Sequence, residues 1–133
     1  MNVLLLDTNV VSILFNRNHQ MRQTCLDIVA QYQLVISFMT RAELLLWPIA
    51  NDWGASRRTA LRQHLTLCLT LYADEHTCEV WAEIVDRCRR AGQRIQTADA
   101  WIASAARRWN CPLVTTDFKD YEAIEGLDVV PVR

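Results

Sequence analysis

The feature that most constrains the fold is the opening stretch of the chain, MNVLLLDTNVVS. Its apolar run, VLLL, stops at the charge of Asp7, so we expect residues 2–6 to form a short buried strand. Thr8 and Asn9 are typical helix N-cap residues, and the apolar residues that follow predict a helix. A carboxylate at the carboxyl end of a buried strand, beside a helix start, lies where open α/β sheets bind their ligands.

Short apolar strands and amphipathic helices alternate along the rest of the chain. Further strands are expected at 34–37, 71–73, 113–115 and 129–130. Helices are expected at about 20–31, after an N-cap at Thr40, at 56–71, at 75–91 and after an N-cap at Thr97. Pro48 should kink or shorten the helix that follows Thr40, near Leu44–Leu45. This alternation predicts a single α/β domain over residues 1–133, with a mainly parallel four- to five-stranded sheet covered by helices on both faces.

The composition supports one core and disfavours several kinds of protein. The 133 residues are 51% hydrophobic, which is enough for a buried core. No apolar run reaches the roughly 18 residues of a membrane span, and the first one is too short for a signal peptide. The five cysteines are an odd number without a Cys-x-x-Cys pair, which favours free thiols in a reducing cytoplasm over disulfides or zinc.

Three further acids stand, like Asp7, at a strand end or a helix start. Glu43 and Asp99 fall in the first turns of expected helices, and Asp117 directly follows the expected strand at 113–115. Each alone has a simple structural explanation, as a cap, a capping-box partner of the preceding threonine, a first-turn acid or a turn residue. Because all four follow the same pattern, we expect their carboxylates to converge at one edge of the sheet.

Four converging carboxylates predict a bound cation. Without one they would repel each other strongly and be partly protonated. Oxygen ligands with no accompanying His or Cys set favour Mg²⁺ or Mn²⁺, ions that readily take a substrate phosphate as a further ligand. Such an ion lowers the pKa of a bound water and stabilises a leaving oxygen, so the predicted chemistry is hydrolysis of a phosphodiester bond.

The basic residues are almost all arginines, 13 of 14, with Lys119 as the exception. Guanidinium groups match phosphate oxygens bidentately, so a nucleic-acid partner is compatible with the net charge of −1. The simpler alternative is that they form solvated surfaces and helix ends that match the helix dipole. The candidates for such phosphate contacts are Arg57, Arg58, Arg62, Arg89, Arg90 and Arg94.

Four segments, in order along the chain, resemble the motifs of PIN-domain ribonucleases, and specifically of the VapC-type toxins of bacterial toxin–antitoxin pairs. They are LLLDTNVVS, ISFMTRAELLLW, IQTADAWIASAA and LVTTDFKDY. The resemblance implies a PIN-like three-layer α/β/α fold and a Mg²⁺- or Mn²⁺-dependent endoribonuclease. The acidic quartet it implies, for both catalysis and metal binding, is Asp7, Glu43, Asp99 and Asp117.

The resemblance also implies a role for each residue of this quartet. Asp7 and Asp99 are the foremost metal ligands, and Glu43 positions the ion or the water. Asp117 completes the set, with Asp120 as the alternative. The residues expected to orient these carboxylates through hydrogen bonds are Asn9, Thr115 and Thr116.

The partners that the resemblance implies are an RNA substrate (tRNA or mRNA), a second copy of the chain in a homodimer, and a small cognate antitoxin. The antitoxin's C-terminal segment would lie across the chain and bring a basic side chain toward the acids. The apolar helices around Trp47, Trp53 and 61–69 offer a groove for an amphipathic helix, unless these tryptophans are simply core residues.

Two other functions are compatible with parts of the pattern. A phosphatase or phosphoacceptor domain would use a strand-end Asp as a nucleophile, but the haloacid-dehalogenase pattern needs a second Asp where this chain has Asn9. A non-catalytic PIN-fold module would bind RNA or protein without cleavage. The four acids argue against it, because a pure binding module has no use for clustered carboxylates.

Overall fold

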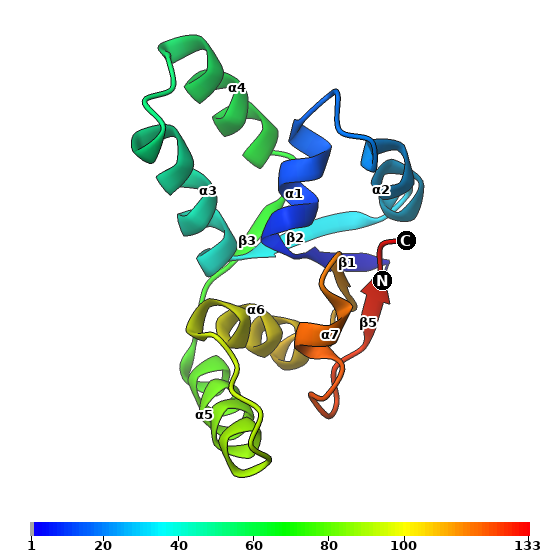
Figure 1. The fold of residues 1–133 in the computed structure, drawn as a ribbon, viewed down its shortest axis with the longest axis vertical. Coiled ribbons are helices and arrows are strands. Elements are labelled where there is room, and N and C mark those ends of the chain that lie inside the picture. The colour runs from blue at the N-terminus through cyan, green and yellow to red at the C-terminus, as the bar shows by residue number, and fades with distance from the viewer. Residues whose placement is uncertain (1) are drawn as a thin grey trace.

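A five-stranded parallel sheet forms the centre of the computed structural model, which describes residues 2–133 (Figure 1). All four strand pairings are parallel, and the strand order is β3-β2-β1-β4-β5. The predicted α/β class and the mainly parallel sheet are therefore confirmed. The strands are β1 (Val3–Leu6), β2 (Gln33–Ser37), β3 (Leu69–Leu71), β4 (Leu113–Thr115) and β5 (Val129–Pro131).

The helices form a layer on each face of this sheet (Figure 1). One layer contains α1 (Thr8–Phe15), α2 (Arg22–Val29), α3 (Phe38–Ala50) and α4 (Ala55–Leu65). The other contains α5 (Glu75–Arg90), α6 (Thr97–Arg108) and the short α7 (Phe118–Tyr121). No helix within residues 2–133 is long and apolar enough to cross a membrane.

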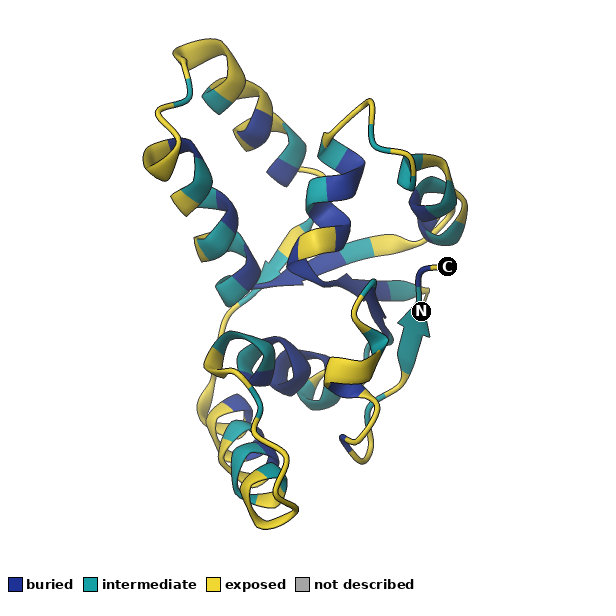
Figure 2. Ribbon diagram, viewed as in Figure 1, coloured by how far each residue is buried: buried dark blue, intermediate teal, exposed yellow. Residues whose placement is uncertain are grey.

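Alternate strand residues point into two separate cores, because successive side chains of a strand face opposite sides of the sheet. Leu4 and Leu6 of β1 pack with the layer of α1 to α4, whereas Leu5 between them packs with α5, α6 and α7. All three are at most 4% exposed. Figure 2 shows the same division, with buried residues along the strands and on the inner side of each helix layer. Burial on both faces explains why these strands are continuous apolar runs in the sequence.

The winding of the sheet places its ligand-binding edge. From β1 the chain adds β2 and then β3 on one side, and it later adds β4 and β5 on the other side of β1. The direction of winding therefore reverses between β1 and β4. In open α/β sheets, ligands bind at such a reversal, outside the carboxyl ends of the strands. Asp7 directly follows β1, and Asp117 follows the end of β4 by two residues.

The structure corrects the predicted caps of two helices. The N-cap of α1 is Asp7 rather than Thr8 or Asn9, because the turn begins directly at the strand end and the Asp7 carboxylate accepts the Thr8 backbone N–H at 2.8 Å. The N-cap of α6 is Gln96, and Thr97 is already helical. Both helices begin about one residue earlier than predicted.

The prediction for the start of α3 was wrong. Its N-cap is Ser37, whose Oγ accepts the Met39 N–H at 3.1 Å, so Thr40 is a buried residue inside the helix and Glu43 is not its capping-box partner. Pro48 does not shorten the helix, which continues to Ala50. A proline this close to the C-terminus removes only one of the last hydrogen bonds, which limits its cost.

Two expected helices are also shorter in the structure. The helix expected at 56–71 ends at Leu65, because residues 69–71 form β3 by pairing with β2 instead of extending the helix. The strand expected at 71–73 is therefore displaced by two residues. The helix expected at 20–31 is limited to Arg22–Val29.

Candidate active site

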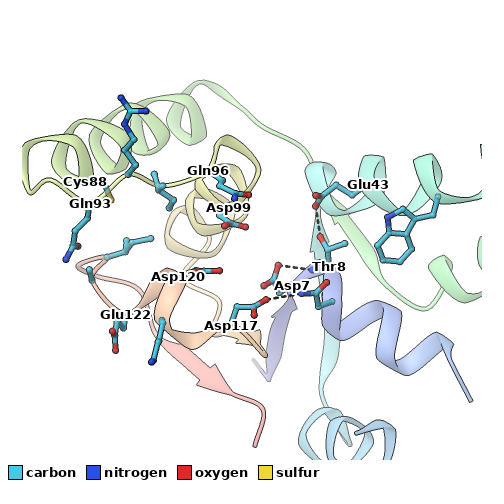
Figure 3. A pocket seen from close by; sticks show the side chains of 17 residues that line it. Asp7, Thr8, Glu43, Cys88, Gln93, Gln96, Asp99, Asp117, Asp120 and Glu122 are labelled. Atoms are coloured by element: carbon cyan, nitrogen blue, oxygen red, sulfur yellow. Dashed lines mark hydrogen bonds between the residues drawn. The ribbon is translucent and has the colours of Figure 1, made fainter. Parts of the chain in front are cut away.

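A cavity of about 600 Å³ opens at the carboxyl ends of β1 and β4 (Figure 3). All four acids of the predicted quartet line it, and they come from four different places in the fold: the β1–α1 junction, α3, α6 and the β4–α7 junction. Figure 3 shows carboxylates from these elements directed into a common space. The acids that line the cavity are Asp7, Glu43, Asp99, Asp117, Asp120 and Glu122.

Asp7 is the most deeply placed of these acids, with 5% of its surface exposed. One carboxylate oxygen accepts the Thr8 N–H at 2.8 Å, and the other accepts the Thr115 hydroxyl at 2.7 Å. Burial raises the pKa of Asp7 above its usual range, and the nearby Asp117 charge adds to this effect, while the two hydrogen bonds counteract it. The position of this carboxylate is thus fixed by both β1 and β4.

Glu43 is held by Thr8, a contact that sequence reasoning missed. The Thr8 hydroxyl donates to Glu43 Oε1 at 2.7 Å (Figure 3). It also lies 3.0 Å from the hydroxyl of Thr40. Thr8 and Glu43 are 35 positions apart in the sequence. A local pattern therefore gives no signal for their contact, which depends on α1 packing against α3.

Asp117 is held by Asn9 and by the end of β4. Asn9 Nδ2 donates to Asp117 Oδ2 at 2.9 Å, and the Asp117 backbone N–H donates to Thr115 Oγ1 at 2.9 Å. Thr116 lies at the limit of hydrogen bonding, 3.5 Å from the same carboxylate. Of the three predicted orienting residues, the structure therefore gives Asn9 and Thr115 close contacts and Thr116 a marginal one. Asp120, in the next turn, also lines the cavity.

Asp99 lies half-buried in the first turn of α6, as predicted, and accepts the Tyr121 hydroxyl at 3.1 Å. Its pKa is raised to about 6, first by burial and then by the charges of Asp7, Asp120 and Glu43, against a lowering by the Tyr121 hydrogen bond. The neighbouring carboxylates thus disfavour ionisation of Asp99.

The donor set of the cavity fits a hydrated Mg²⁺ or Mn²⁺. Within residues 2–133, no three Asp, Glu, His or Cys side chains are gathered so as to enclose an ion by themselves. Mg²⁺ does not require such a cage, because it keeps several waters and usually takes only one or two carboxylates plus substrate phosphate oxygens. An open cavity lined by carboxylates, with part of its wall exposed to solvent, has the chemistry that this ion needs.

The arginines considered for RNA contact lie in different environments, and all six are within the described residues. Arg94 lines the acidic cavity, whereas the other five do not. Arg58 donates to the backbone carbonyls of Trp53 and Pro48, at 2.7 and 3.0 Å. Arg57 lies over the Trp53 ring, with its guanidinium carbon 3.7 Å from the ring centroid, and Arg62 is exposed on α4. Arg89 and Arg90, near the end of α5, both pair with Asp86.

A second cavity, of about 1130 Å³, lies between α1, α3 and α4. Its wall combines aromatic and apolar groups with basic ones, and within the described residues it contains no Asp or Glu. Trp47 lines both this groove and the acidic cavity, so the two adjoin. The aromatic and basic residues of the groove are Phe15, Arg17, Arg22, Trp47, Trp53, Arg57 and His64.

Comparison with known proteins gives consistent matches over nearly the whole chain. The family model described as PIN domain matches residues 4–126. The chain is similar to the ribonuclease VapC4 of Mycobacterium tuberculosis, with 31% identity over 108 residues that cover 80% of this chain and 82% of that protein.

Two solved structures resemble the fold closely. VapBC2 from Rickettsia felis, bound to a DNA fragment from its promoter, aligns with a TM-score of 0.86 and 22% identity over 97% of this chain and 98% of that one. VapBC-1 from nontypeable Haemophilus influenzae aligns with a TM-score of 0.81 and 25% identity over 97% of both chains.

Proposed function

Because the chain belongs to the PIN domain family, we propose that it is a Mg²⁺- or Mn²⁺-dependent endoribonuclease, and that it acts as the toxin of a toxin–antitoxin pair. The observation that carries this proposal is the convergence of Asp7, Glu43, Asp99 and Asp117 from four parts of the fold on one cavity. So many carboxylates in one partly buried place oppose one another's charge, and this arrangement is useful when a cation binds there.

The residues that would hold the ion are Asp7 and Asp99, and Asp117 lines the same cavity beside them. The chemistry that such an ion supplies is activation of a water and stabilisation of the charge that develops on the phosphate. Thr115 and Thr8 keep the Asp7 carboxylate directed into the cavity. Glu43, which accepts the Thr8 hydroxyl at 2.7 Å, would help to position the ion or the water.

The RNA would enter as a polyanion at a cavity that is itself acidic. Arg94 and Lys119 are the basic residues in the cavity wall, and both are exposed. They are therefore placed to contact phosphates on either side of the scissile bond, with charge-assisted hydrogen bonds. The substrate, tRNA or mRNA, is part of the proposal, and its choice would depend on RNA shape beyond the cavity.

The groove between α1, α3 and α4 is the proposed binding site of the antitoxin. Its aromatic residues suit the apolar face of an amphipathic helix, and its basic residues suit acidic groups beside that face. Because Trp47 lines both cavities, a segment that continues past it would reach the acids, where a basic side chain could occupy the place of the ion. The two similar VapBC structures support such a partner.

The proposed homodimer would use exposed apolar side chains. Leu46 and Ile49 on α3 are 57% and 65% exposed, and Leu69 in the edge strand β3 is 57% exposed. A contiguous patch of exposed apolar residues is typical of surfaces that another chain covers, so these side chains are the proposed dimer surface.

The experiment that tests the proposed function is cleavage of a mixed tRNA and mRNA pool by the purified, antitoxin-free protein. It is run with Mg²⁺, with Mn²⁺ and with EDTA, and beside the variants Asp7→Asn and Asp99→Asn. The matched control is Asp27→Asn, which removes an exposed acid of α2 that does not line the cavity. We expect cleavage that requires the ion and both cavity acids but not Asp27. Absence of cleavage by a folded protein in every pool would favour the non-catalytic binding module.

A further inference from the structure

Tyr121 is a buried hydroxyl-bearing residue that lies beneath the acidic cavity rather than in its wall. The side chain is 1% exposed and belongs to the core formed with α5 and α6. It ends the short α7, directly after Asp120. Its ring packs as an apolar group, whereas its hydroxyl is directed at the carboxylates above it and donates to Asp99 Oδ1 at 3.1 Å.

The same hydroxyl also lies beside Asp7. The hydroxyl lowers the pKa of Asp7 as well as that of Asp99, but the hydrogen bond that it donates within the described residues is to Asp99. Tyr121 therefore lies close to the acid at the end of β1 and is bonded to the acid in the first turn of α6, although these two elements are far apart in the chain.

Within the described residues, Asp99 has this contact as its single side-chain hydrogen bond, as Glu43 has that of Thr8. Asp7 has donors in Thr8 and Thr115, and the remaining two acids of the quartet accept from Thr8 and Asn9. Within residues 2–133, the Tyr121 hydroxyl is the one hydrogen-bond donor to the Asp99 side chain. Without it, repulsion by neighbouring carboxylates would turn Asp99 toward solvent.

We propose that Tyr121 is a positioning residue, whose hydroxyl holds the Asp99 carboxylate next to that of Asp7 so that both can face one cation. This inference rests on the proposed metal-dependent function. A phenol suits the task because it donates a hydrogen bond without adding a positive charge that would compete with the ion. Burial of the ring fixes the direction of the donor, which a flexible surface side chain could not do.

The test compares wild type with Tyr121→Phe, which keeps the ring and removes the hydroxyl. Mn²⁺ binding is measured by electron paramagnetic resonance on metal-free protein, which does not depend on activity. We expect the dissociation constant for Mn²⁺ to rise about tenfold, as is typical when a partner of a metal ligand is lost. The melting temperature of the metal-free protein should change little, and kcat for RNA should fall while KM stays near its wild-type value.

The matched control is Ser104→Ala, which removes another fully buried hydroxyl, on the same helix as Asp99 but bonded to the Ala100 carbonyl. We expect wild-type Mn²⁺ affinity for this variant. A second measurement uses the double variant Tyr121→Phe with Asp99→Asn. If Tyr121 acts through Asp99, the double variant should bind Mn²⁺ no more weakly than Asp99→Asn alone, whereas a general packing defect would add its own loss.

The outcomes separate this inference from the proposed function. Wild-type Mn²⁺ affinity in Tyr121→Phe, or full additivity in the double variant, would overturn the role of Tyr121 while leaving the nuclease proposal intact. A wild-type protein that neither binds Mn²⁺ nor cleaves RNA would overturn both.

Discussion

The Thr115 hydroxyl donates to the Asp7 carboxylate at 2.7 Å, although the two residues are 108 positions apart in the sequence. They meet because β1 and β4 are neighbours in the sheet, where Leu6 is paired with Val114. Thr115 also accepts the Asp117 backbone N–H, so one hydroxyl connects two acids of the candidate site. The two acids are therefore held together at the place where the direction of winding reverses, between β1 and β4.

Thr115→Val should destabilise the protein at neutral pH. The substitution keeps the shape of the side chain but leaves the 5%-exposed Asp7 carboxylate with one donor fewer. Loss of a hydrogen bond to a charged group costs about 1.5–3 kcal/mol. Urea unfolding should show this loss at pH 7, and Thr70→Val, a similar change at a half-exposed position of β3, should cost much less. Equal stabilities of the two variants would contradict the role of Thr115.

Local patterns in the sequence were sufficient for the class of sheet and for three of the four acids. Buried parallel strands are short apolar runs that end at polar residues, and this made Asp7, Asp99 and Asp117 visible as acids at strand ends or helix starts. The caps were predicted less well, because one-residue shifts depend on how tightly each strand passes into its helix. Thr40 matched a capping-box pattern with Glu43. The N-cap of α3 is nevertheless Ser37, because the helix begins directly at the end of β2.

The contacts between side chains could not be predicted from local sequence. Thr8 holds Glu43 and Tyr121 holds Asp99 only after α1, α3, α6 and α7 have packed together. Tyr121 in particular is a common kind of core residue, and its hydroxyl acquires a role from the acids that the fold places above it. The arginines show the reverse case. The high share of arginine among the basic residues suggested contacts with RNA, whereas the structure shows that Arg58 donates to backbone carbonyls of its own chain.

Ionisation of Asp99 should lower the free energy of unfolding of the metal-free protein as the pH rises from about 4 to about 6. Its pKa in the folded protein is about 6, raised first by burial and then by the charges of Asp7, Asp120 and Glu43. In this range the folded state binds more protons than the unfolded state, whose Asp has an ordinary pKa near 3.9. The free energy of unfolding therefore decreases through this window, and the stabilisation by protonation is fully present only below it.

The measurement is the difference in melting temperature between wild type and Asp99→Asn in EDTA, from pH 4.5 to pH 7.5. The difference removes the contribution of His64, whose pKa is lowered by burial and which therefore destabilises the folded state at acidic pH. We expect Asp99→Asn to gain stability relative to wild type as the pH rises. Mg²⁺ should reduce this gain at pH 7.5, because it offsets the same charge. A pH-independent difference would mean that Asp99 ionises normally.

Arg58→Ala should reduce stability rather than RNA binding alone. The guanidinium is half-buried and donates to the carbonyls of Trp53 and Pro48, which tie the start of α4 to the end of α3. Loss of these bonds should cost about 1–3 kcal/mol, because charged donors bind carbonyls more strongly than neutral ones. Thermal unfolding compares it with Arg62→Ala, an exposed arginine on the same helix, for which we expect a change within about 0.5 kcal/mol. A stable Arg58→Ala protein would return this residue to the RNA-binding candidates.

Arg94 is the candidate arginine that the structure brings to the acidic cavity, so it should contribute most directly to RNA binding. A contact between a guanidinium and a phosphate releases counterions, and its loss reduces the dependence of the affinity on salt. Arg94→Ala should therefore weaken binding of a single-stranded RNA and lower the slope of log affinity against log salt by about 1. The binding assay uses the Asp7→Asn background, so that the RNA stays intact while the affinity is measured between 50 and 200 mM salt, roughly the range over which such contacts are distinguished. Arg62→Ala serves as the control for an exposed arginine outside the cavity, and its slope should equal that of the background protein. If both variants lower the slope equally, RNA follows the general basic surface of the chain and the cavity wall has no special part in holding it.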